Sequence, residues 1–540
     1  MSQQRPLGAQ ISHMLKARGV DVVFGIPGVH NQELYRGIEE AGITHVLARH
    51  EQGAGFMADG YARATGRPGV CYVITGPGVL NALTPLGQAY SDSVPVLMVA
   101  SCLDETAATR GQLHQMRDQE GAAATVTDWS DTAQTPQAAY ALIDRALQDM
   151  ATNRPRPKAL HVPIAQLEAE AAPDWPAKPF LGPRPVEPEP DWITYTAQEV
   201  AQAKRPLFIF GGGARDAAVA PVGQGQPTPV QALLARSGAA AFTTFAGRGI
   251  VPADYPLLLG SYLSRPEAEG LIGSADLVIA IGTELAEVDL WRDQLGHSGR
   301  LIRVDIDAEP LASNLPGQTP IRSDATRFVQ ALTDALGDGA PQTGWTQAEA
   351  ADFRARMRSA VSAERPGLLG VIDAVQAAMP TDAMIYSDMC QLAYAAKEVW
   401  NMDRPGHWHH PYGFGTLGYA LPAGIGGAVA RPDGPTCVII GDYGLQYTLP
   451  ELGTAVELGL PLPIILWDNG KLGEIEDSMI RAQIAPNAVI QQNPDFLMLA
   501  RAYGADAVEP ATLADIAPAL RAAFKACRPT VIRLTPDLFS

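Results

Sequence analysis

Two polar residues stand just past short apolar runs in the last third of the chain. Asp442 follows the run at 437–440, and Asn469 comes shortly after the run at 463–467. Ligands of open parallel sheets collect at the carboxyl ends of the strands. A carboxylate and an amide oxygen there could bind Mg²⁺, which takes hard oxygen ligands and usually keeps places for phosphate oxygens and water. The alternative is that both residues only cap the helices that follow.

The elements that must position these residues alternate between short apolar runs and longer amphipathic stretches. This alternation is typical of βαβ units whose parallel strands are buried on both faces. Two stretches are predicted to be linkers: the Pro- and Glu-rich residues 166–192, and residues 336–367, which open with Gly and Pro and continue as a charged helix. We therefore predict an α/β protein of three domains, each a mostly parallel sheet flanked by helices, over residues 1–170, 190–336 and 366–540.

Composition restricts the classes of function. The 540 residues carry a formal net charge of −18, which argues against a sequence-independent grip on nucleic acid. The five cysteines are scattered without a C-x-x-C pair, so neither a disulfide framework nor a zinc site is indicated. The N-terminus lacks a signal-peptide pattern, and no apolar run approaches the roughly 20 residues of a membrane span. We expect a cytoplasmic protein that acts on a small molecule and has no nucleic-acid or membrane partner.

The stretch from Asp442 to Asn469 resembles the diphosphate-binding signature of thiamine diphosphate (ThDP) enzymes, which reads G-D-G and later N-N. The resemblance implies that Asp442, Asn469 and the main-chain carbonyl of Lys471 bind Mg²⁺, and that this metal holds the cofactor diphosphate. Tyr443 stands where the family usually has a small residue, and Gly444 follows it. Both are expected near the diphosphate, with the Tyr443 ring pointing away or taking part itself.

Further motifs extend the resemblance over most of the chain. The segment GFGTLGYALPAGIGG is similar to the one that precedes G-D-G, which implies that Leu417 wedges under the cofactor and that the Gly415 carbonyl meets its aminopyrimidine. The segment RHEQGAGFMADGYARATG implies that Glu51 is the carboxyl group that keeps N1′ of the pyrimidine protonated. Without the resemblance, Glu51 would be an ordinary glutamate at a helix start. Other residues implied to line the cofactor are Pro27, Gly28, Thr75, Asn81 and Gln391.

Three further motifs allow weaker interpretations. The segment LHQMRDQE lies where carboligating relatives carry a functional Gln, so Gln119 is a candidate contact and His114 a candidate proton donor, with a structural histidine as the alternative. The glycines at 211–213 follow a strand but lack the full G-x-G-x-x-G, so FAD stays an unproven additional cofactor. The motif HWHH at 407–410 has no partner cluster with zinc spacing, and we expect it to pack or to border the active site.

The resemblance also indicates a substrate. Phrases such as GIPGVHNQELYRGI, LHQMRDQ and NPDFLMLARAYGA most resemble enzymes assigned as 5-guanidino-2-oxopentanoate (2-ketoarginine) decarboxylases of arginine catabolism, and more broadly acetolactate synthase large subunits. The first group implies formation of 4-guanidinobutanal and CO₂, and the second implies carboligation of 2-oxo acids. A non-catalytic protein with this fold is a third alternative. The family plan implies a homodimer or homotetramer in which Glu51 of one chain faces Asp442 of another.

A short acidic stretch follows the Asn469 loop. Glu474, Glu476 and Asp477 begin a predicted helix. The helix macrodipole alone favours acids there. The functional alternative is that Glu474 or Asp477 accepts the planar guanidinium of the substrate in a charge-assisted, two-pronged bond.

Overall fold

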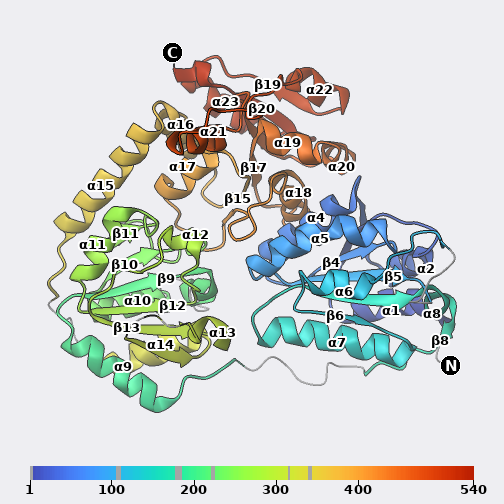
Figure 1. Ribbon diagram of the computed structural model, residues 1–540, viewed down its shortest axis with the longest axis horizontal. Helices are drawn as coiled ribbons and strands as arrows, with labels where there is room; N and C mark the ends of the chain where they lie inside the picture. Colours follow the sequence, from blue (N-terminus) through green and yellow to red (C-terminus); the bar gives the residue numbers. More distant parts are fainter. Residues whose placement is uncertain are drawn as a thin grey trace.

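The computed structural model describes residues 4–104, 111–176, 185–219, 226–313, 315, 317–338 and 343–539 (Figure 1). It contains three six-stranded sheets, and every strand pair within them is parallel. Helices flank each sheet, so the predicted α/β class is confirmed. Among the described residues, no helix is long and apolar enough to cross a membrane.

The N-terminal sheet has the strand order β3-β2-β4-β5-β7-β6. Its strands are β2 (Val22–Gly25), β3 (Thr44–Leu47), β4 (Gly69–Val73), β5 (Val96–Cys102), β6 (Trp129–Thr132) and β7 (Lys158–Pro163). The helices are α1 (Leu7–Ala17), α2 (Gln32–Arg36), α3 (Ile38–Ala41), α4 (Glu51–Thr65), α5 (Pro77–Ser91), α6 (Gln119–Ala124), α7 (Pro136–Thr152) and α8 (Ile164–Glu168). A short antiparallel pair, β1 (Arg5–Pro6) with β8 (Glu170–Ala171), joins the two ends of this part of the chain.

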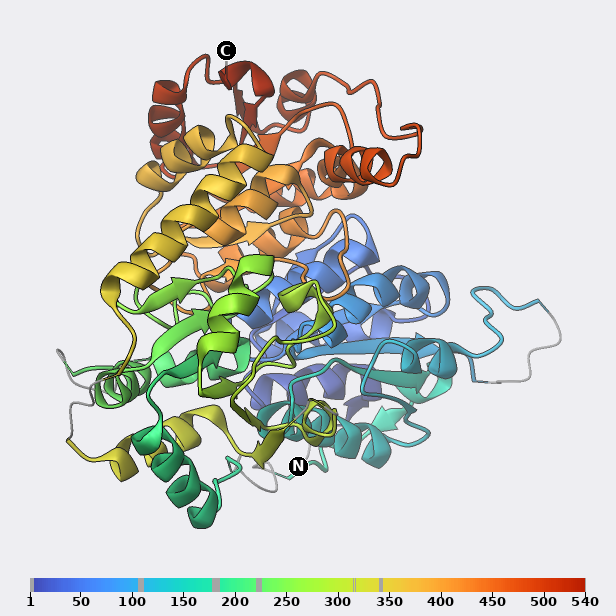
Figure 2. The ribbon, with the colours of Figure 1, turned by 60° about the vertical axis from the view of Figure 1, so that its left-hand side comes forward.

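The middle sheet has the order β11-β10-β9-β12-β13-β14, which is the 3-2-1-4-5-6 arrangement of dinucleotide-binding sheets. Its strands are β9 (Pro206–Phe210), β10 (Ala240–Thr243), β11 (Leu258–Gly260), β12 (Leu277–Ile281), β13 (Arg300–Asp305) and β14 (Gln318–Arg322). Around it lie α9 (Pro190–Gln202), η1 (Gly212–Ala218), α10 (Pro229–Ser237), α11 (Pro266–Ser274), α12 (Glu287–Leu290), α13 (Ala308–Leu311) and α14 (Ala325–Leu336). The predicted charged helix of the second linker is α15 (Gln347–Glu364), which runs from the middle domain to the C-terminal domain (Figure 2).

The C-terminal sheet has the order β16-β15-β17-β18-β20-β19, so it repeats the path of the N-terminal sheet strand for strand. Its strands are β15 (Met384–Ser387), β16 (Trp408–His409), β17 (Thr436–Gly441), β18 (Pro463–Trp467), β19 (Asp506–Val508) and β20 (Thr530–Leu534). The helices are α16 (Leu368–Ala378), α17 (Gln391–Val399), α18 (Ala420–Ala430), α19 (Asp442–Thr448), α20 (Glu451–Glu457), α21 (Gly473–Arg481), α22 (Phe496–Ala502), α23 (Leu513–Ala523) and η2 (Pro536–Phe539). In both sheets the strand order reverses beside the first strand, which is where open α/β sheets bind ligands.

The N-terminal and C-terminal domains pack through α4 and α18, which lie side by side in the centre of the molecule (Figure 1). Glycines permit this close approach, because a side chain at Gly60 would overlap the Ala423 carbonyl and one at Gly426 would overlap the Met57 carbonyl. Tyr386 Oη donates a hydrogen bond to the Gly60 carbonyl at 2.7 Å. One hydrophobic core therefore extends through both domains.

Candidate active site

The carboxyl ends of β17 and β18 bring the two strand-end residues together. The register pairs Gly441 with Trp467, so Asp442 and the residues after β18 leave the sheet side by side. Asp442 Oδ1 accepts the Tyr443 N–H at 2.9 Å, and Oδ2 accepts the Gly470 N–H at 2.8 Å. The Asp442 carboxylate is thus fixed between the start of α19 and the loop that carries Asn469.

Two buried carboxylates share one amide at this point. The Nδ2 of Asn493 donates to Asp442 Oδ2 at 2.7 Å and to Asp468 Oδ1 at 2.6 Å. Asp468 also pairs with Arg533 at 2.7 Å, whereas no Lys or Arg of the described chain pairs with Asp442, which is only 3 % exposed. Burial raises the pKa of Asp442, and the neighbouring charge of Asp468 adds to this. A buried anion without a cationic partner fits a divalent cation, because unpaired buried charge is costly.

The amide of Asn469 is oriented by the first residue of α17, the helix that follows β15. Asn469 Nδ2 donates to Gln391 Oε1 at 2.9 Å, and Asn469 Oδ1 accepts the Lys471 N–H at 3.4 Å, which is a long contact. Asp442, Asn469 and the Lys471 carbonyl are therefore the residues that could hold Mg²⁺ here. Within the described ranges, no group of three or more His, Cys, Asp and Glu side chains is placed to hold a metal, so this set would rely on one carboxylate with amide and main-chain oxygens.

Asp388 organises the loop that precedes α18, and sequence reasoning missed it. Its buried carboxylate accepts the N–H groups of Met389 at 2.9 Å, Gly418 at 3.2 Å and Ala420 at 2.9 Å. Burial raises the pKa of Asp388 to about 6, while these N–H donors oppose the rise. Asp388 follows the apolar run of β15, so the strand-end argument that selected Asp442 could have found it too.

Glycine conformations shape the same loop. Gly415 and Gly418 have φ of 68° and 84°, the left-handed region that side chains disfavour. Half-buried Leu417 lies between them. Gly444 allows the Asp388 carboxylate to approach closely, because an added Cβ would come within 2.8 Å of it. Tyr443, the preceding residue, is partly exposed.

The second half of the site lies at the carboxyl ends of the N-terminal sheet. Glu51 is the first residue of α4, and its Oε2 accepts a hydrogen bond from Asn81 Nδ2 at 2.9 Å. Gly78 lies beside the other oxygen, since a Cβ there would be in ordinary contact with Oε1 at 3.4 Å. No Lys or Arg pairs with Glu51 in the described part of the chain, so its carboxyl group is available to a partner with an N–H.

Gln119 is bound into the loop after β4. Its Oε1 accepts the Gly76 N–H at 3.0 Å, and its Nε2 lies 2.9 Å from both the Ser101 carbonyl and His161 Nδ1. Buried Thr75 donates to Ser101 Oγ at 2.8 Å. Since both ends of the Gln119 amide are engaged within the protein, the geometry favours a positioning role for this residue over direct contact with substrate.

The loop of Pro27 and Gly28 approaches the same place. Gly28 N–H donates to Asn31 Oδ1 at 2.7 Å, and a side chain on Gly28 would overlap Ile74. The rings of His30 and His114 meet edge to face with centroids 4.8 Å apart. His114 has a φ of 63°, and its carbonyl lies against Gly76. Thus Glu51, Asn81, Gln119 and His114 gather around one loop.

Within one chain the two halves of the site lie at different ends of α5. Glu51 binds Asn81 near the start of this helix, whereas Thr416 Oγ1 donates to Gln88 Oε1 at 2.9 Å, and Gly413 N–H donates to Asp92 Oδ1 at 2.9 Å. Gln88 follows Asn81 by seven positions along the helix, or about 10 Å of rise. Glu451 accepts the N–H groups of residues 49 and 50, which fixes the start of α4 against α20.

The acids of α21 differ in their partners. Glu474 accepts two hydrogen bonds from Arg365, at 2.9 and 3.1 Å. Glu476 pairs with Lys471 at 2.6 Å. Asp477 is approached only by Gln391 Nε2 at 3.5 Å and has no cationic partner among the residues described. Of the two predicted guanidinium acceptors, Asp477 is the one whose charge is not already balanced.

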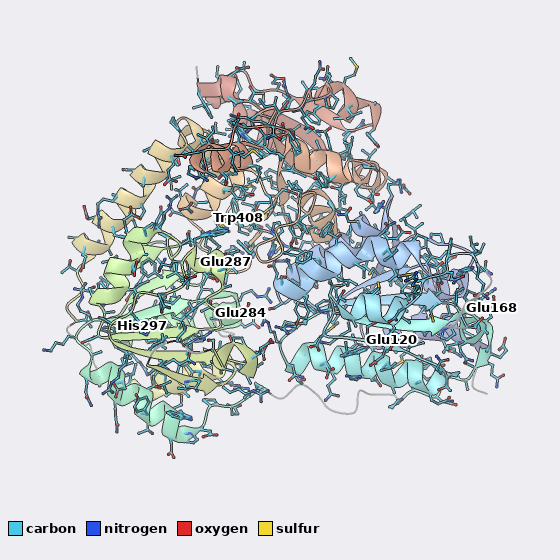
Figure 3. The ribbon with its side chains drawn as sticks, viewed as in Figure 1. Glu120, Glu168, Glu284, Glu287, His297 and Trp408 are labelled. Atoms are coloured by element: carbon cyan, nitrogen blue, oxygen red, sulfur yellow. The ribbon has the colours of Figure 1, made fainter. Side chains whose placement is uncertain are left out.

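Two weaker motifs have structural explanations. Gly211 and Gly213 pack against the turn at Gly282, where added side chains would overlap backbone. Their position after β9, beside β12, is also the switch point of a dinucleotide-binding sheet order, so FAD stays a prediction. Glu284 lies on the side of the middle domain that faces the N-terminal domain (Figure 3) and pairs there with Arg154. His409 and His410 are buried, and burial lowers the pKa of each well below its usual value.

Comparison with known proteins connects this geometry to a family. Three models of the thiamine pyrophosphate (that is, ThDP) enzyme match the chain: the N-terminal TPP binding domain at residues 5–122, the central domain at 193–332 and the C-terminal TPP binding domain at 388–534. The chain is 42% identical over 539 residues to the probable 2-ketoarginine decarboxylase AruI of Pseudomonas aeruginosa, covering 99% of this chain and 95% of that protein.

Acetolactate synthases are more distant relatives. The chain is 30% identical over 520 residues to the isozyme 2 large subunit of Escherichia coli, covering 92% of this chain and 89% of that protein. It is 29% identical over 540 residues to the large subunit of Corynebacterium glutamicum, with 96% and 85% covered. The predicted resemblance to both groups is confirmed, and this chain belongs to the thiamine pyrophosphate enzyme family.

Proposed function

We propose that this protein is a ThDP- and Mg²⁺-dependent 2-oxo acid decarboxylase that converts 5-guanidino-2-oxopentanoate and a proton to 4-guanidinobutanal and CO₂. The observation that carries the proposal is the 42% identity, over 99% of the chain, to a protein named as a probable 2-ketoarginine decarboxylase. Arginine catabolism in the cytoplasm would be the corresponding setting.

The residues of the chain divide the work between the two halves of the site. When bound, ThDP supplies a carbon nucleophile that adds to the 2-oxo group and accepts the electron pair released with CO₂. Asp442, Asn469 and the Lys471 carbonyl would hold Mg²⁺ and through it the diphosphate. Glu51, oriented by Asn81, would hold a proton at N1′ of the pyrimidine. His114 is the proposed proton donor near the substrate.

Substrate choice would depend on Asp477. It is half-buried and lies on the first turns of α21. Among the described residues its only hydrogen-bond donor is Gln391, at 3.5 Å, which also binds Asn469. A guanidinium reaching Asp477 would form a charge-assisted bond. Glu474 is less suited, because Arg365 already supplies it with a guanidinium.

Carboligation is the second candidate, favoured by the acetolactate synthases among the relatives. The test is to incubate the protein, ThDP and Mg²⁺ with 2-ketoarginine and, separately, with pyruvate. An aldehyde from 2-ketoarginine supports the proposal, and acetolactate from pyruvate supports carboligation. Failure of both reactions in a protein that binds ThDP would favour a non-catalytic binding role. Flavin absorbance of the purified protein tests FAD at the same time.

We further propose that the active site forms between two chains, in a homodimer or a homotetramer. Within one chain, Glu51 and the loop before α18 contact α5 at Asn81 and at Gln88, about two helical turns apart. The plan implied by the thiamine pyrophosphate enzyme family would bring Glu51 of one chain to the loop of a second chain.

A further inference from the structure

A cavity away from the candidate active site lies between the middle domain, α15 and the C-terminal domain. Its volume is about 490 Å³, within the range of small-molecule sites. The walls are the ends of β10 and β11, one face of α15, the end of α16 and the end of α17. Figure 2 shows how α15 spans the two domains beside it.

The charges in this cavity are not balanced by the protein. Arg358 pairs with Asp373 at 2.6 Å, and Glu398 pairs with Arg265 at 2.5 Å, although Arg265 is shared with Glu364. Arg248 and Arg354 also line the cavity, and neither has a carboxylate partner among the described residues. The lining thus has three arginines against two acids, an excess of one positive charge.

Both unpaired guanidinium groups are held by neutral oxygens. Arg354 donates to the Leu258 carbonyl. Arg248 donates to the carbonyls of Lys397 at 2.9 Å and Phe245 at 3.2 Å, and its Nη2 is buried without a hydrogen-bond partner in the described chain. Carbonyl groups orient an arginine but do not cancel its charge.

Arg248 is fixed in a buried position. It is 5 % exposed, and its guanidinium lies over the Trp408 ring at 4.3 Å. Trp408 itself lies where the middle and C-terminal domains meet (Figure 3). Burial lowers the pKa of Arg248 and of Arg354, in agreement with the lack of anionic partners. A buried unpaired cation is costly, and an anion that entered the cavity would remove that cost.

We propose that this cavity binds a small organic anion through a phosphate or carboxylate group that Arg248 and Arg354 receive. Arginine suits this task, because its planar fork matches both groups. Thr243 and Ser261 add hydroxyls, and Tyr262 and Trp400 add apolar surface for the rest of the ligand. The site is separate from the cofactor site, but α17 joins them: Gln391 at its start binds Asn469, and Val399 at its end lines the cavity.

Calorimetry of the full-length protein saturated with ThDP and Mg²⁺ tests the proposal, since the diphosphate site is then filled. ADP probes for a phosphate ligand and succinate for a carboxylate ligand, while inorganic phosphate tests the bare anion and adenosine is the neutral control. We expect saturable binding of ADP or succinate and none of adenosine. Arg354→Gln should raise that Kd about 10-fold or more, the effect of losing one charge-assisted bond.

The matched control is Arg356→Gln. Arg356 lies on the same helix, is exposed, pairs with Asp352 at 2.9 Å and does not line the cavity, so its loss should leave the Kd unchanged. Arg354→Lys keeps the charge and should recover part of the affinity. The proposal is overturned if ADP, succinate and phosphate all fail to bind at millimolar concentration, or if Arg354→Gln and Arg356→Gln bind alike.

Discussion

Asn81 donates a hydrogen bond to Glu51 at 2.9 Å, from the first turns of α5 to the first residue of α4. The bond fixes one carboxylate oxygen and leaves the other beside Gly78. Glu51 can therefore present a directed oxygen without a salt bridge.

Glu51→Gln should leave ThDP bound and lower turnover about 10²-fold or more, because an amide cannot hold the proton that the carboxyl group holds. Asn81→Ala should have a smaller effect, about 10-fold or less, since it removes one neutral donor and keeps the carboxylate. Steady-state rates with calorimetric ThDP binding separate the two. Near-native turnover in Glu51→Gln would refute the role given to this residue.

Asp442→Ala should weaken Mg²⁺-dependent ThDP binding by at least about 100-fold, more than is typical for loss of an outer partner of a metal ligand. The same change relieves a buried charge but also removes the acceptor of three hydrogen bonds, from Tyr443, Gly470 and Asn493, so thermal unfolding without cofactor must show that the variant stays folded. Calorimetry and thermal unfolding give the two readouts. The control is Asp506→Ala, which removes an exposed acid of the same domain. Equal ThDP affinity in the two variants would reject the metal assignment.

Mixing the two inactive variants tests the site between chains. In a mixed dimer of Glu51→Gln and Asp442→Ala chains, one of the two sites would combine the intact Glu51 of one chain with the intact Asp442 of the other. If half the reassembled dimers are mixed, the activity should recover to about a quarter of the wild-type value. Recovery near zero, with mixed dimers shown by mass spectrometry, would mean that each chain builds its own site.

The buried His161 should make the free energy of unfolding depend on pH. Burial lowers its pKa to about 4, so between pH 6.5 and pH 4 the unfolded chain binds a proton that the folded chain does not. Stability present above pH 6.5 should therefore fall by about 3 kcal/mol as the pH drops to 4. Urea unfolding over this range should show the loss in the wild type but a smaller one in His161→Leu, which has no imidazole to titrate. Parallel pH curves would contradict this.

Much of the fold followed from the apolar runs, because a strand buried on both faces must be continuously apolar. The runs before Asp442 and Asn469 are β17 and β18, and the charged helix of the second linker is α15. The matching strand orders of the first and last sheets left no visible repeat in the sequence, since topology depends on which strands pair and not on which residues recur.

The partners within the site were harder to predict. Asn493 reaches Asp442 from a loop far along the chain, and Glu451 binds the start of α4 from the other domain. Such contacts exist only after the domains pack, so no local pattern indicates them. The same holds for the acids of α21. From the sequence, Glu474 and Asp477 were equal candidates for binding the guanidinium, and only the fold shows that Arg365 already donates hydrogen bonds to Glu474.

That difference between Glu474 and Asp477 sets the last prediction. Asp477→Asn should lower kcat/KM for 2-ketoarginine about 10- to 100-fold, the effect of losing a charge-assisted bond to the guanidinium, and leave the uncharged 2-oxohexanoate unaffected. Glu474→Gln releases Arg365 rather than the substrate, so it should change both substrates to the same extent. Glu476→Gln, whose partner is Lys471, is the matched control on the same helix. Equal losses on both substrates in Asp477→Asn would show that this acid stabilises α21 and does not read the guanidinium.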